Sequence, residues 1–378
     1  MINEAAYWMA LAHLPNWGNQ KRNNLIIKFY HELGLTPEAF FNLTENAWKS
    51  NFELSVKEFE DLKAAKLELA NNAFLAEKLH NEGYELIPII SPDYSKNLKE
   101  CFKNGAPTLL YIKGNKQIMS EKTIAIVGSR NASEISLQFT DNIAKIASKE
   151  FKVVVSGFAK GVDKQALESA LIYKGQSIIV LPQGILTFGS GFKTYYRQIT
   201  DGDLLVVSTF LPKAPWKTEL AMARNPIIYG LASEIYVAES SESGGTWSGA
   251  IDGIKKGRRV LVRKPGIEEK NANELLISKG AIAVDFNGTL IPEYHAAGQR
   301  SESVSITEPN ADYRIAIINL LKSGEHTFQG IIKKLNLNLP DTELKEFLIS
   351  HKEIEVIKKN TTKYTIRTSP SQQKSLFD

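Results

Sequence analysis

Residues 123–130 read TIAIVGSR, a run of β-branched and small apolar residues that ends in Gly128, Ser129 and Arg130. The run has the composition of a buried parallel strand, and residues with little side chain follow it at once. Glycine lets backbone N–H groups approach a phosphate closely, and a helix that begins after such a loop adds a favourable dipole. The stretch therefore predicts an α/β fold with an anion-binding loop at the end of a strand.

The same passage from strand to small-residue loop recurs three times. It is found in KVVVSGFAKGVD (152–163), in SIIVLPQG (177–184) and in EIYVAESSESGGTW (234–247). Parallel strands end at one edge of a sheet, and open α/β sheets bind ligands there. Several anion-binding loops side by side favour a phosphate-rich ligand over one small metabolite.

Short β-rich runs alternate with helical stretches over most of the chain. Helical stretches such as LQFTDNIAKIASKE (137–150) and DKQALESALIYKG (163–175) separate several of the apolar runs. This alternation predicts an extended Rossmann-like, doubly wound sheet over residues 81–300, with further strands at its edges.

The two ends of the chain have other patterns. Residues 1–80 place apolar residues at helical spacing and predict an N-terminal helical domain, in which LPNWGNQKRNN (14–24) resembles a helix-hairpin-helix or SAM-like element. Such an element either donates backbone N–H groups to phosphate or only packs. Residues 301–310 are polar and predict a linker, and the tail at 369–378 is expected to be disordered.

Residues 311–368 predict three short helices and a β-ribbon, the pattern of a winged-helix domain. Its expected recognition helix, PDTELKEFLISHKE (340–353), mixes acids with bases and is poorly suited to a major groove. Sequence-specific duplex binding and a protein-contact or structural role both remain open for this domain.

The composition limits the compartment and the partners of the protein only broadly. The 378 residues include one cysteine, Cys101, which excludes an internal disulfide and fits a reducing compartment. The net charge of +4 permits an anionic partner without requiring one. The start has no basic region before an apolar stretch, and no apolar run reaches the roughly 20 residues that span a bilayer. A cytoplasmic protein without membrane contact is expected.

Familiar catalytic motifs are missing from the sequence. The loop at Gly128 supplies one glycine and then a cation, whereas the dinucleotide fingerprint requires G-x-G-x-x-G and an acid about 20 residues later. The six histidines are scattered, the single cysteine has no partner, and no G-x-S-x-G elbow occurs. Asp163 either caps a helix or acts as a base. The sequence therefore predicts anion binding without catalysis, cofactor or metal.

Cations lie near several of the predicted strand ends. Arg130 follows a strand-end glycine, Lys160 lies inside the second loop, and Arg224 with Asn225 precedes a strand-rich segment. An arginine can bind a phosphate through two parallel N–H groups. Each cation alone is equally compatible with a solvated surface, but their coincidence at several strand ends favours a phosphate-binding rim.

A further cationic segment follows the third loop. Lys193 and Arg197 flank Tyr195 and Tyr196 beside the glycine-rich TFGSGF. Cations interleaved with aromatic side chains suit single-stranded nucleic acid, because bases stack while phosphates pair with charge. These residues are therefore added to the predicted site.

In this order the motifs resemble the DNA-processing protein A family, also called DprA or Smf. The resemblance is carried by IAIVGSR (124–130), SGFAKGVD (156–163), LPQGI (181–185), Arg224-Asn225 and the segment from SESGGTW to GRRVLV (241–262). It extends over nearly the whole length, because a helical domain precedes these motifs and a winged-helix pattern follows them.

The resemblance implies a Rossmann-like protein that binds single-stranded DNA and is dimeric through that domain. Such proteins protect incoming DNA in natural transformation, hand it to the RecA recombinase, and need no cofactor. Carried over motif by motif, the DNA-binding residues are Gly128, Ser129, Arg130, Ser156, Gly157, Lys160, Gly161, Arg224, Asn225, Ser243 and Gly244.

The sequence also departs from the family pattern. Lys160 stands where the family has arginine, Leu167 where it has histidine, and Pro226 where it has a second basic residue. The alternative is therefore a nucleotide-binding sensor or enzyme of a related Rossmann-like fold with a role in genome defence. The run from Gly244 through Gly245 to Thr246 fits a loop that holds one phosphorylated ribose.

Overall fold

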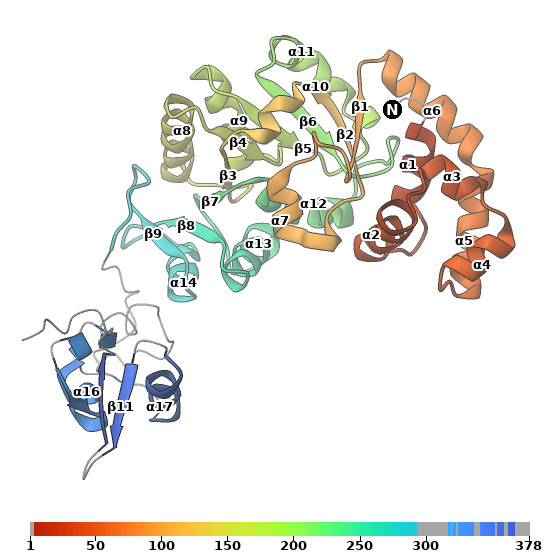
Figure 1. Ribbon diagram of the computed structural model, residues 1–378. Helices are drawn as coiled ribbons and strands as arrows, with labels where there is room; N and C mark the ends of the chain where they lie inside the picture. The colour runs from red at the N-terminus through yellow and green to blue at the C-terminus, as the bar shows by residue number, and fades with distance from the viewer. Residues whose placement is uncertain are drawn as a thin grey trace, which may run out of the picture. The chain divides into compact units, whose positions relative to one another are not determined.

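The computed structural model describes residues 4–292 without a break and, beyond them, residues 317–318, 320–322, 324–335, 341–351, 354–358 and 362–366. The chain divides into two compact units, Met1–Ala296 and Ala297–Asp378 (Figure 1). The predicted linker at 301–310 and the predicted tail at 369–378 lie outside the described residues.

A nine-stranded sheet forms the centre of the first unit. Its strands are β1 (Glu85–Pro88), β2 (Leu109–Gly114), β3 (Thr123–Val127), β4 (Val153–Ser156), β5 (Ser177–Val180), β6 (Leu204–Ser208), β7 (Glu234–Val237), β8 (Arg259–Arg263) and β9 (Ile282–Val284). Their order in the sheet is β1-β2-β6-β5-β4-β3-β7-β8-β9. The pairs β1–β2 and β2–β6 are antiparallel and the others are parallel. The large, mostly parallel sheet agrees with the predicted α/β class.

Helices connect the strands and cover both faces of the sheet. They are α7 (Lys96–Phe102), α8 (Glu134–Lys149), α9 (Val162–Ile172), α10 (Gly189–Thr194), α11 (Tyr196–Thr200), α12 (Thr218–Leu231), α13 (Gly244–Lys255) and α14 (Asn273–Ser278), with the 3₁₀ turns η3 (Lys103–Gly105), η4 (Lys116–Ser120) and η5 (Ile185–Thr187).

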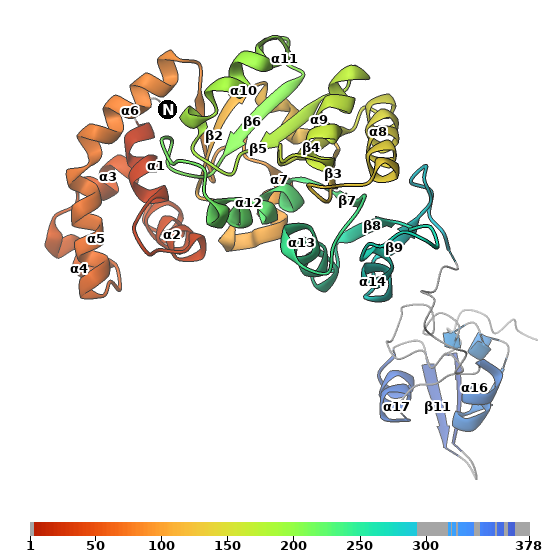
Figure 2. The same cartoon turned by 180° about the vertical axis from the view of Figure 1, so that it is seen from behind.

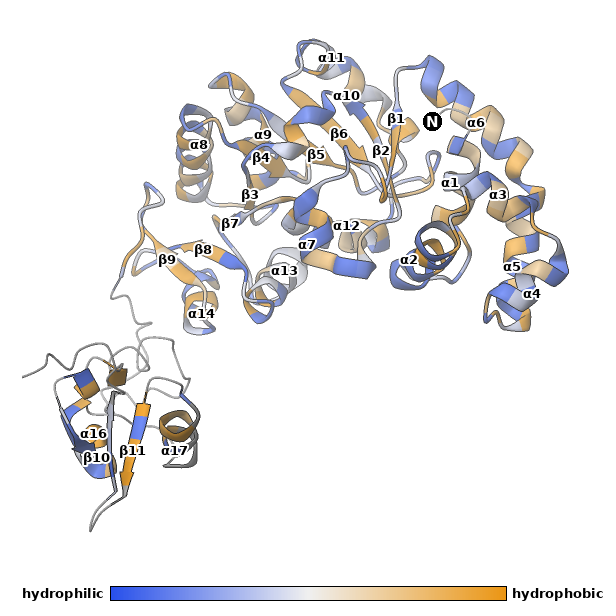
Figure 3. Ribbon diagram, in the orientation of Figure 1, coloured by the Kyte–Doolittle hydropathy of each residue, from blue (hydrophilic) through white to orange (hydrophobic). Residues whose placement is uncertain are grey.

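The alternation of side chains along β3 separates the two layers of helices. Ile124 and Ile126 pack with Phe139 of α8, whereas Ala125 packs with Ile227 of α12 on the other face. Helices α8 and α9 therefore cover one face, and α7, α12, α13 and α14 cover the opposite one (Figure 2). The strands between them are mainly apolar (Figure 3).

The order of strands reverses next to β3. After β3 the chain adds β4, β5 and β6 on one side, then crosses to β7, which pairs with β3 on the other side. The loops after β3 and β7 consequently lead away in opposite directions. Open α/β sheets bind ligands in the crevice that forms at such a switch point.

Residues 5–81 are helical, as their apolar spacing predicts. The helices are α1 (Ala5–Ala12), α2 (Asn19–Ile26), the π-helix η2 (Ile27–Glu32), α3 (Pro37–Asn42), α4 (Glu45–Asn51), α5 (Val56–Leu67) and α6 (Leu69–Asn81). Three of them begin at side-chain caps, because Thr36, Thr44 and Ser55 each accept a hydrogen bond from a backbone N–H in the first turn.

These N-terminal helices share a buried cluster with the sheet. Trp8 and Met9 of α1 belong to the same cluster as Leu109 and Tyr111 of β2. The helices thus lie in the same compact unit as the sheet. Their assignment to a separate helix-hairpin-helix or SAM-like domain ending at residue 80 stays a prediction.

The second unit contains helices and a small antiparallel sheet among its described residues. These elements are β10 (His326–Thr327), α16 (Phe328–Leu335), α17 (Asp341–Ser350), β11 (Ile354–Lys358) and β12 (Thr362–Ile366), with the strand order β10-β12-β11. Ile331 of α16, Leu348 of α17 and Tyr364 of β12 are buried in its core. The winged-helix assignment over 311–368 stays a prediction, since part of the segment lies outside the described residues.

Across the described ranges, none of the helices combines the length and the apolar character that crossing a bilayer requires.

Candidate functional site

A cavity of about 380 Å³ opens at the switch point and is lined by the loops after β3 and β7, by α12 and by the start of α13. A second cavity, of about 340 Å³, lies between the loop after β3 and the start of α9. Arg130 and Asn131 line both cavities. The two cavities therefore adjoin at one rim of the sheet.

Most of the site residues predicted from the sequence line these cavities. The first cavity is lined by Gly128, Ser129, Arg130, Arg224, Asn225, Ser243, Gly244, Gly245 and Thr246. The second is lined by Arg130, Lys160 and Gly161. Four predicted residues, all within the described part of the chain, line neither cavity: Ser156, Gly157, Lys193 and Arg197.

Backbone hydrogen bonds to two neighbouring segments fix the loop after β3. The Ser129 N–H donates to the Glu239 carbonyl at 2.9 Å, and the Val162 N–H donates to the Ser129 carbonyl at 3.2 Å. A side chain at Gly128 would place its Cβ 2.6 Å from Val162 Cγ2. Glycine is thus required at 128 for the loop to pack against the start of α9.

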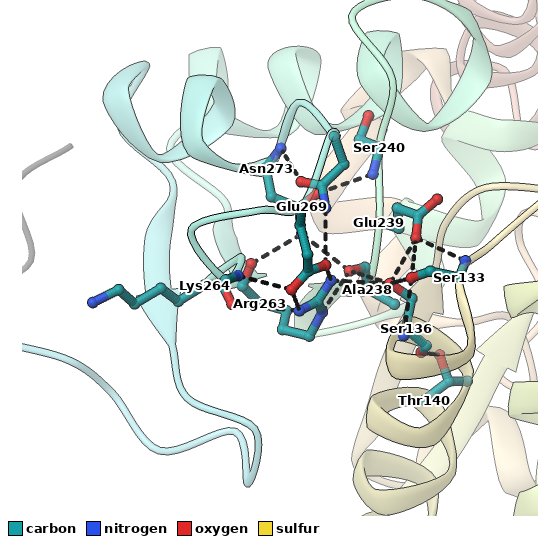
Figure 4. A network of polar contacts seen from close by, with 12 residues as sticks. Ser133, Ser136, Thr140, Ala238, Glu239, Ser240, Arg263, Lys264, Glu269 and Asn273 are labelled. Atoms are coloured by element: carbon teal, nitrogen blue, oxygen red, sulfur yellow. Dashed lines mark hydrogen bonds and ion pairs between the residues drawn. The ribbon is translucent and has the colours of Figure 1, made fainter. Parts of the chain in front are cut away.

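Glu239, just beyond the end of β7, connects this loop to the start of α8 (Figure 4). Its carboxylate accepts hydrogen bonds from the Ser133 N–H at 2.9 Å, the Ser133 hydroxyl at 2.6 Å and the Ser136 hydroxyl at 2.8 Å. Because Ser133 is the N-cap of α8, the carboxylate lies at the positive end of that helix.

Arg263 extends the same network on the side of β8 (Figure 4). The side chain is 3% exposed and donates to the Ala238 carbonyl at 3.1 Å and the Ser136 hydroxyl at 3.0 Å. Glu269 forms a bidentate ion pair with the guanidinium, and that contact lowers the pKa of Glu269. Buried charge here is paired and fully hydrogen-bonded, so the network holds the loop after β7 rigidly.

Arg224 lies inside the wall of the first cavity. It is 3% exposed, and its Nη1 donates to the Val180 carbonyl at 2.8 Å. A side chain at Gly157 would collide with its guanidinium, and the Gly157 N–H donates to Asp163 Oδ2 at 3.2 Å. Arg224 therefore joins α12 to the ends of β4 and β5, and most of its surface is covered by protein.

Burial sets the protonation behaviour of this group. It raises the pKa of the Asp163 carboxyl, while Arg224 and the N–H groups of Gly157 and Ala159 oppose the rise. Burial also lowers the pKa of Arg224, and Asp163 opposes that change. Since guanidinium groups stay charged in proteins, Arg224 is the buried cation beside Asp163. The Asp163 carboxylate accepts hydrogen bonds from backbone N–H groups of the loop after β4. The sequence alone allows a helix cap or a catalytic base for this residue.

Two cations face the cavities from the surface. Arg130 and Lys160 are exposed, and they lie in consecutive loops at the carboxyl ends of the neighbouring strands β3 and β4. Lys164, also on the second cavity, is partly neutralised by Glu168 at 3.6 Å. The positive charge available to a ligand at this rim therefore comes chiefly from Arg130 and Lys160.

The start of α13 forms the opposite wall of the first cavity. Gly244 has a φ of +88°, a conformation that favours glycine, and it begins the helix. The Thr246 hydroxyl donates to the Gly128 carbonyl at 3.1 Å. A side chain at Gly245 would collide with the amide of Asn225. This small-residue start leaves backbone N–H groups accessible to an anion.

The residues predicted around the third loop line neither cavity, and their part in binding stays a prediction. Lys193 lies on α10 and Arg197 on α11, away from both cavities. Tyr195 is buried, and its ring contacts Phe158 with the ring centroids 5.7 Å apart, so it offers little surface to a base. Ser156 is buried as well and donates its hydroxyl to the Ile126 carbonyl at 3.0 Å.

Asn131, Met222 and Glu239 are among the residues of the site that sequence reasoning overlooked. Asn131 and Met222 line the first cavity, and Glu239 holds its loop. Asn131 and Glu239 could have been found by their position in the sequence, because each stands in a loop that directly follows a buried strand. In the part of the chain that the structure describes, no group of three or more His, Cys, Asp or Glu is placed to hold a metal ion.

Comparison with known proteins finds relatives that share one name, DNA processing protein DprA. The DNA processing protein DprA of Streptococcus pneumoniae is 27% identical over 270 residues, which cover 69% of this chain and 94% of the relative. The protein of the same name from Bacillus subtilis is 29% identical over 210 residues, covering 54% and 69%. The X-ray structure of the S. pneumoniae protein has the same fold, with a TM-score of 0.56, 24% identity and coverage of 74% and 94%.

The family model for DNA recombination-mediator protein A matches residues 85–294, more than half of the 378 residues. The match includes the whole sheet and every residue of the two cavities. This chain belongs to the DNA recombination-mediator protein A family, the DprA/Smf proteins.

Proposed function

We propose that this chain binds single-stranded DNA along the rim formed by the loops after β3, β4 and β7. The observation that carries the proposal is the meeting of two cavities at Arg130 and Asn131. Linked nucleotides can occupy both adjoining cavities, whereas a single nucleotide can occupy only one of them. The names of the family and its relatives, which speak of DNA processing and recombination, support DNA as the polymer.

The chemistry of the rim suits phosphate groups. Helices α9 and α13 begin at the two cavities, and helix N-termini favour anions. Arg130 and Lys160 add exposed positive charge, which neutralises the backbone of a nucleic acid. Two acids near the rim are already bonded within the protein: Asp163 accepts from Gly157, and Glu239 accepts from Ser133.

The proposed physiological role follows the family. The protein protects incoming DNA in natural transformation and loads it onto the RecA recombinase, acting in the cytoplasm as a homodimer through the sheet unit. It binds without turnover. The description of the family as a mediator of DNA recombination supports this role.

Titration of a fluorescently labelled oligothymidylate, followed by anisotropy at several salt concentrations, tests the proposal. The affinity is expected to fall steeply with salt, and Arg130→Ala to weaken binding and reduce the slope of log K against log salt by about 0.7, the value for one phosphate contact on a single strand. Arg197→Ala, which removes an exposed arginine away from both cavities, is the matched control. Absence of binding at low salt, or equal effects of the two substitutions, would refute the proposal.

A nucleotide-binding sensor or enzyme is the second candidate. The first cavity, of about 380 Å³, lies within the range of small-molecule pockets, and Gly244, Gly245 and Thr246 line it. A thermal-shift series with nucleoside mono-, di- and triphosphates discriminates the candidates. Stabilisation by one nucleotide that exceeds stabilisation by an oligothymidylate at equal phosphate concentration would favour the sensor or enzyme.

A further inference from the structure

We propose that Glu239 is the positioning residue of this nucleic-acid site, holding the segment from Ser129 to Ser133 in the conformation in which Arg130 meets phosphate. The inference rests on the proposed function, because it assigns a role within the same site. It concerns a residue that lines neither cavity and acts through the loop it holds.

The geometry of the segment is the first argument. Glu239 fixes both of its ends: the backbone carbonyl accepts from the Ser129 N–H at 2.9 Å, and the carboxylate accepts from the Ser133 N–H at 2.9 Å and the Ser133 hydroxyl at 2.6 Å. Arg130 and Asn131, which line both cavities, lie between those two ends. One residue thus holds the short loop that both cavities share.

The rigidity of Glu239 itself is the second argument. Its neighbour Ala238 has its carbonyl bound by Arg263 Nε at 3.1 Å and by Asn273 Nδ2 at 3.0 Å. On the other side, the Ser240 N–H donates to Asn273 Oδ1 at 2.9 Å. The backbone on both sides of Glu239 is therefore fixed to β8 and α14 before any ligand arrives, as preorganised sites require (Figure 4).

The sign of the effect separates positioning from simple electrostatics. A carboxylate beside a phosphate site repels the ligand, so its removal should raise the affinity if charge alone matters. If Glu239 acts by holding the loop, its removal should lower the affinity, because the Arg130 segment must then be ordered when DNA binds. The two explanations predict opposite changes.

The experiment compares Glu239→Gln and Glu239→Asp with the control Glu242→Gln in the oligothymidylate titration. Glu242 is exposed three residues further along the same loop, so its substitution removes the same charge from that loop without touching the Glu239 hydrogen bonds. Both Glu239 variants should bind about tenfold more weakly, since each weakens hydrogen bonds to a charged group. Glu242→Gln should bind as well as the wild type or up to about twofold more tightly.

The salt dependence gives an independent readout. Glu239→Gln should keep the wild-type slope of log K against log salt, because the same phosphates are contacted, whereas Arg130→Ala should lower that slope by about 0.7. Wild-type or tighter binding by Glu239→Gln, or a reduced slope, would overturn the inference while leaving the proposed function intact. Failure of the wild type itself to bind would instead refute the proposed function.

A milder variant keeps the test decisive if Glu239→Gln does not fold. Ser133→Ala removes one hydroxyl and leaves the bond from the Ser133 N–H to Glu239 in place. The hydroxyl also caps α8 by accepting from the Ser136 N–H, so the comparison requires thermal unfolding close to that of the wild type. Under that condition the variant should bind about threefold more weakly, because the hydroxyl no longer bonds Glu239. Unchanged affinity of the folded Ser133→Ala protein would contradict the inference.

Discussion

Replacing Arg224 by methionine tests whether this arginine holds the cavity wall or contacts the ligand. Methionine preserves most of the aliphatic volume and removes the guanidinium, which is 3% exposed and donates to the Val180 carbonyl at 2.8 Å. Asp163, 8% exposed, then remains without its cation. Arg224 acts on the Asp163 carboxylate through its charge rather than through a direct ion pair, and leaving a buried carboxylate uncompensated costs up to about 3 to 5 kcal/mol. The carboxyl can take up a proton, so we expect a loss of about 3 kcal/mol.

The loss should depend on pH with a defined sign. Burial already raises the pKa of Asp163 in the folded protein, and Arg224 opposes the rise, so Arg224→Met should raise that pKa further. A group whose pKa is higher in the folded state contributes most stability at low pH and loses it as pH rises through the folded pKa. The variant should therefore be least stable relative to the wild type near pH 8 and approach it towards pH 5.

Urea unfolding followed by tryptophan fluorescence measures this difference. All five tryptophans lie in the first compact unit, so the signal reports the unit that contains Arg224. The double variant Asp163→Asn/Arg224→Met, which removes the buried charge as well, should recover part of the loss. A variant within about 1 kcal/mol of the wild type at pH 8, or a gap that is the same at both pH values, would refute the assignment of Arg224 to the wall.

Three further outcomes follow from the site and the fold. Lys160→Ala should weaken binding of single strands about threefold and reduce the salt slope, measured by anisotropy. Gly245→Ala should weaken binding in the same assay, because a methyl group there collides with the amide of Asn225, whereas Gly189→Ala, which meets open space, should not. Burial lowers the pKa of His13 to about 4, so the stability that its neutral form contributes is present above pH 6.5 and lost as pH falls through 4. The loss should reach about 3 kcal/mol in urea unfolding, and His13→Gln should abolish most of it.

The strands could be predicted because each one is marked by a short run of apolar residues in its own sequence. The runs at 123–127 and 153–156 carry β-branched residues on both faces and form fully buried parallel strands, whereas the run at 234–237 is β-branched and buried on one face. A continuous apolar run of this length is stable as a strand only where helices cover both faces of the sheet. The antiparallel insertion of β2 between β1 and β6 depends on pairing between distant segments, which composition does not encode.

Which cations of the site are exposed depends on packing between segments that are far apart in the sequence. Arg224 and Arg130 look alike in the sequence, yet Arg224 is buried because α12 places it against the ends of β4 and β5, while Arg130 lies in a loop. Lys193 and Arg197 follow β5, which β4 separates from the switch point at β3 and β7. Their exclusion from the cavities therefore follows from strand order, a property of the whole sheet.

The cations of the rim fall into two groups with different consequences for the ligand. Arg224 and Arg263 are buried next to acids and hold the loops, whereas Arg130 and Lys160 are exposed at the cavities. Among residues that line the first cavity, Arg130 is the exposed cation, so a mononucleotide there gains little charge neutralisation. A strand crossing both cavities meets Arg130, Lys160 and the starts of two helices. Affinity should consequently rise with oligonucleotide length, and a thymidine monophosphate should compete poorly with an oligothymidylate of about ten nucleotides.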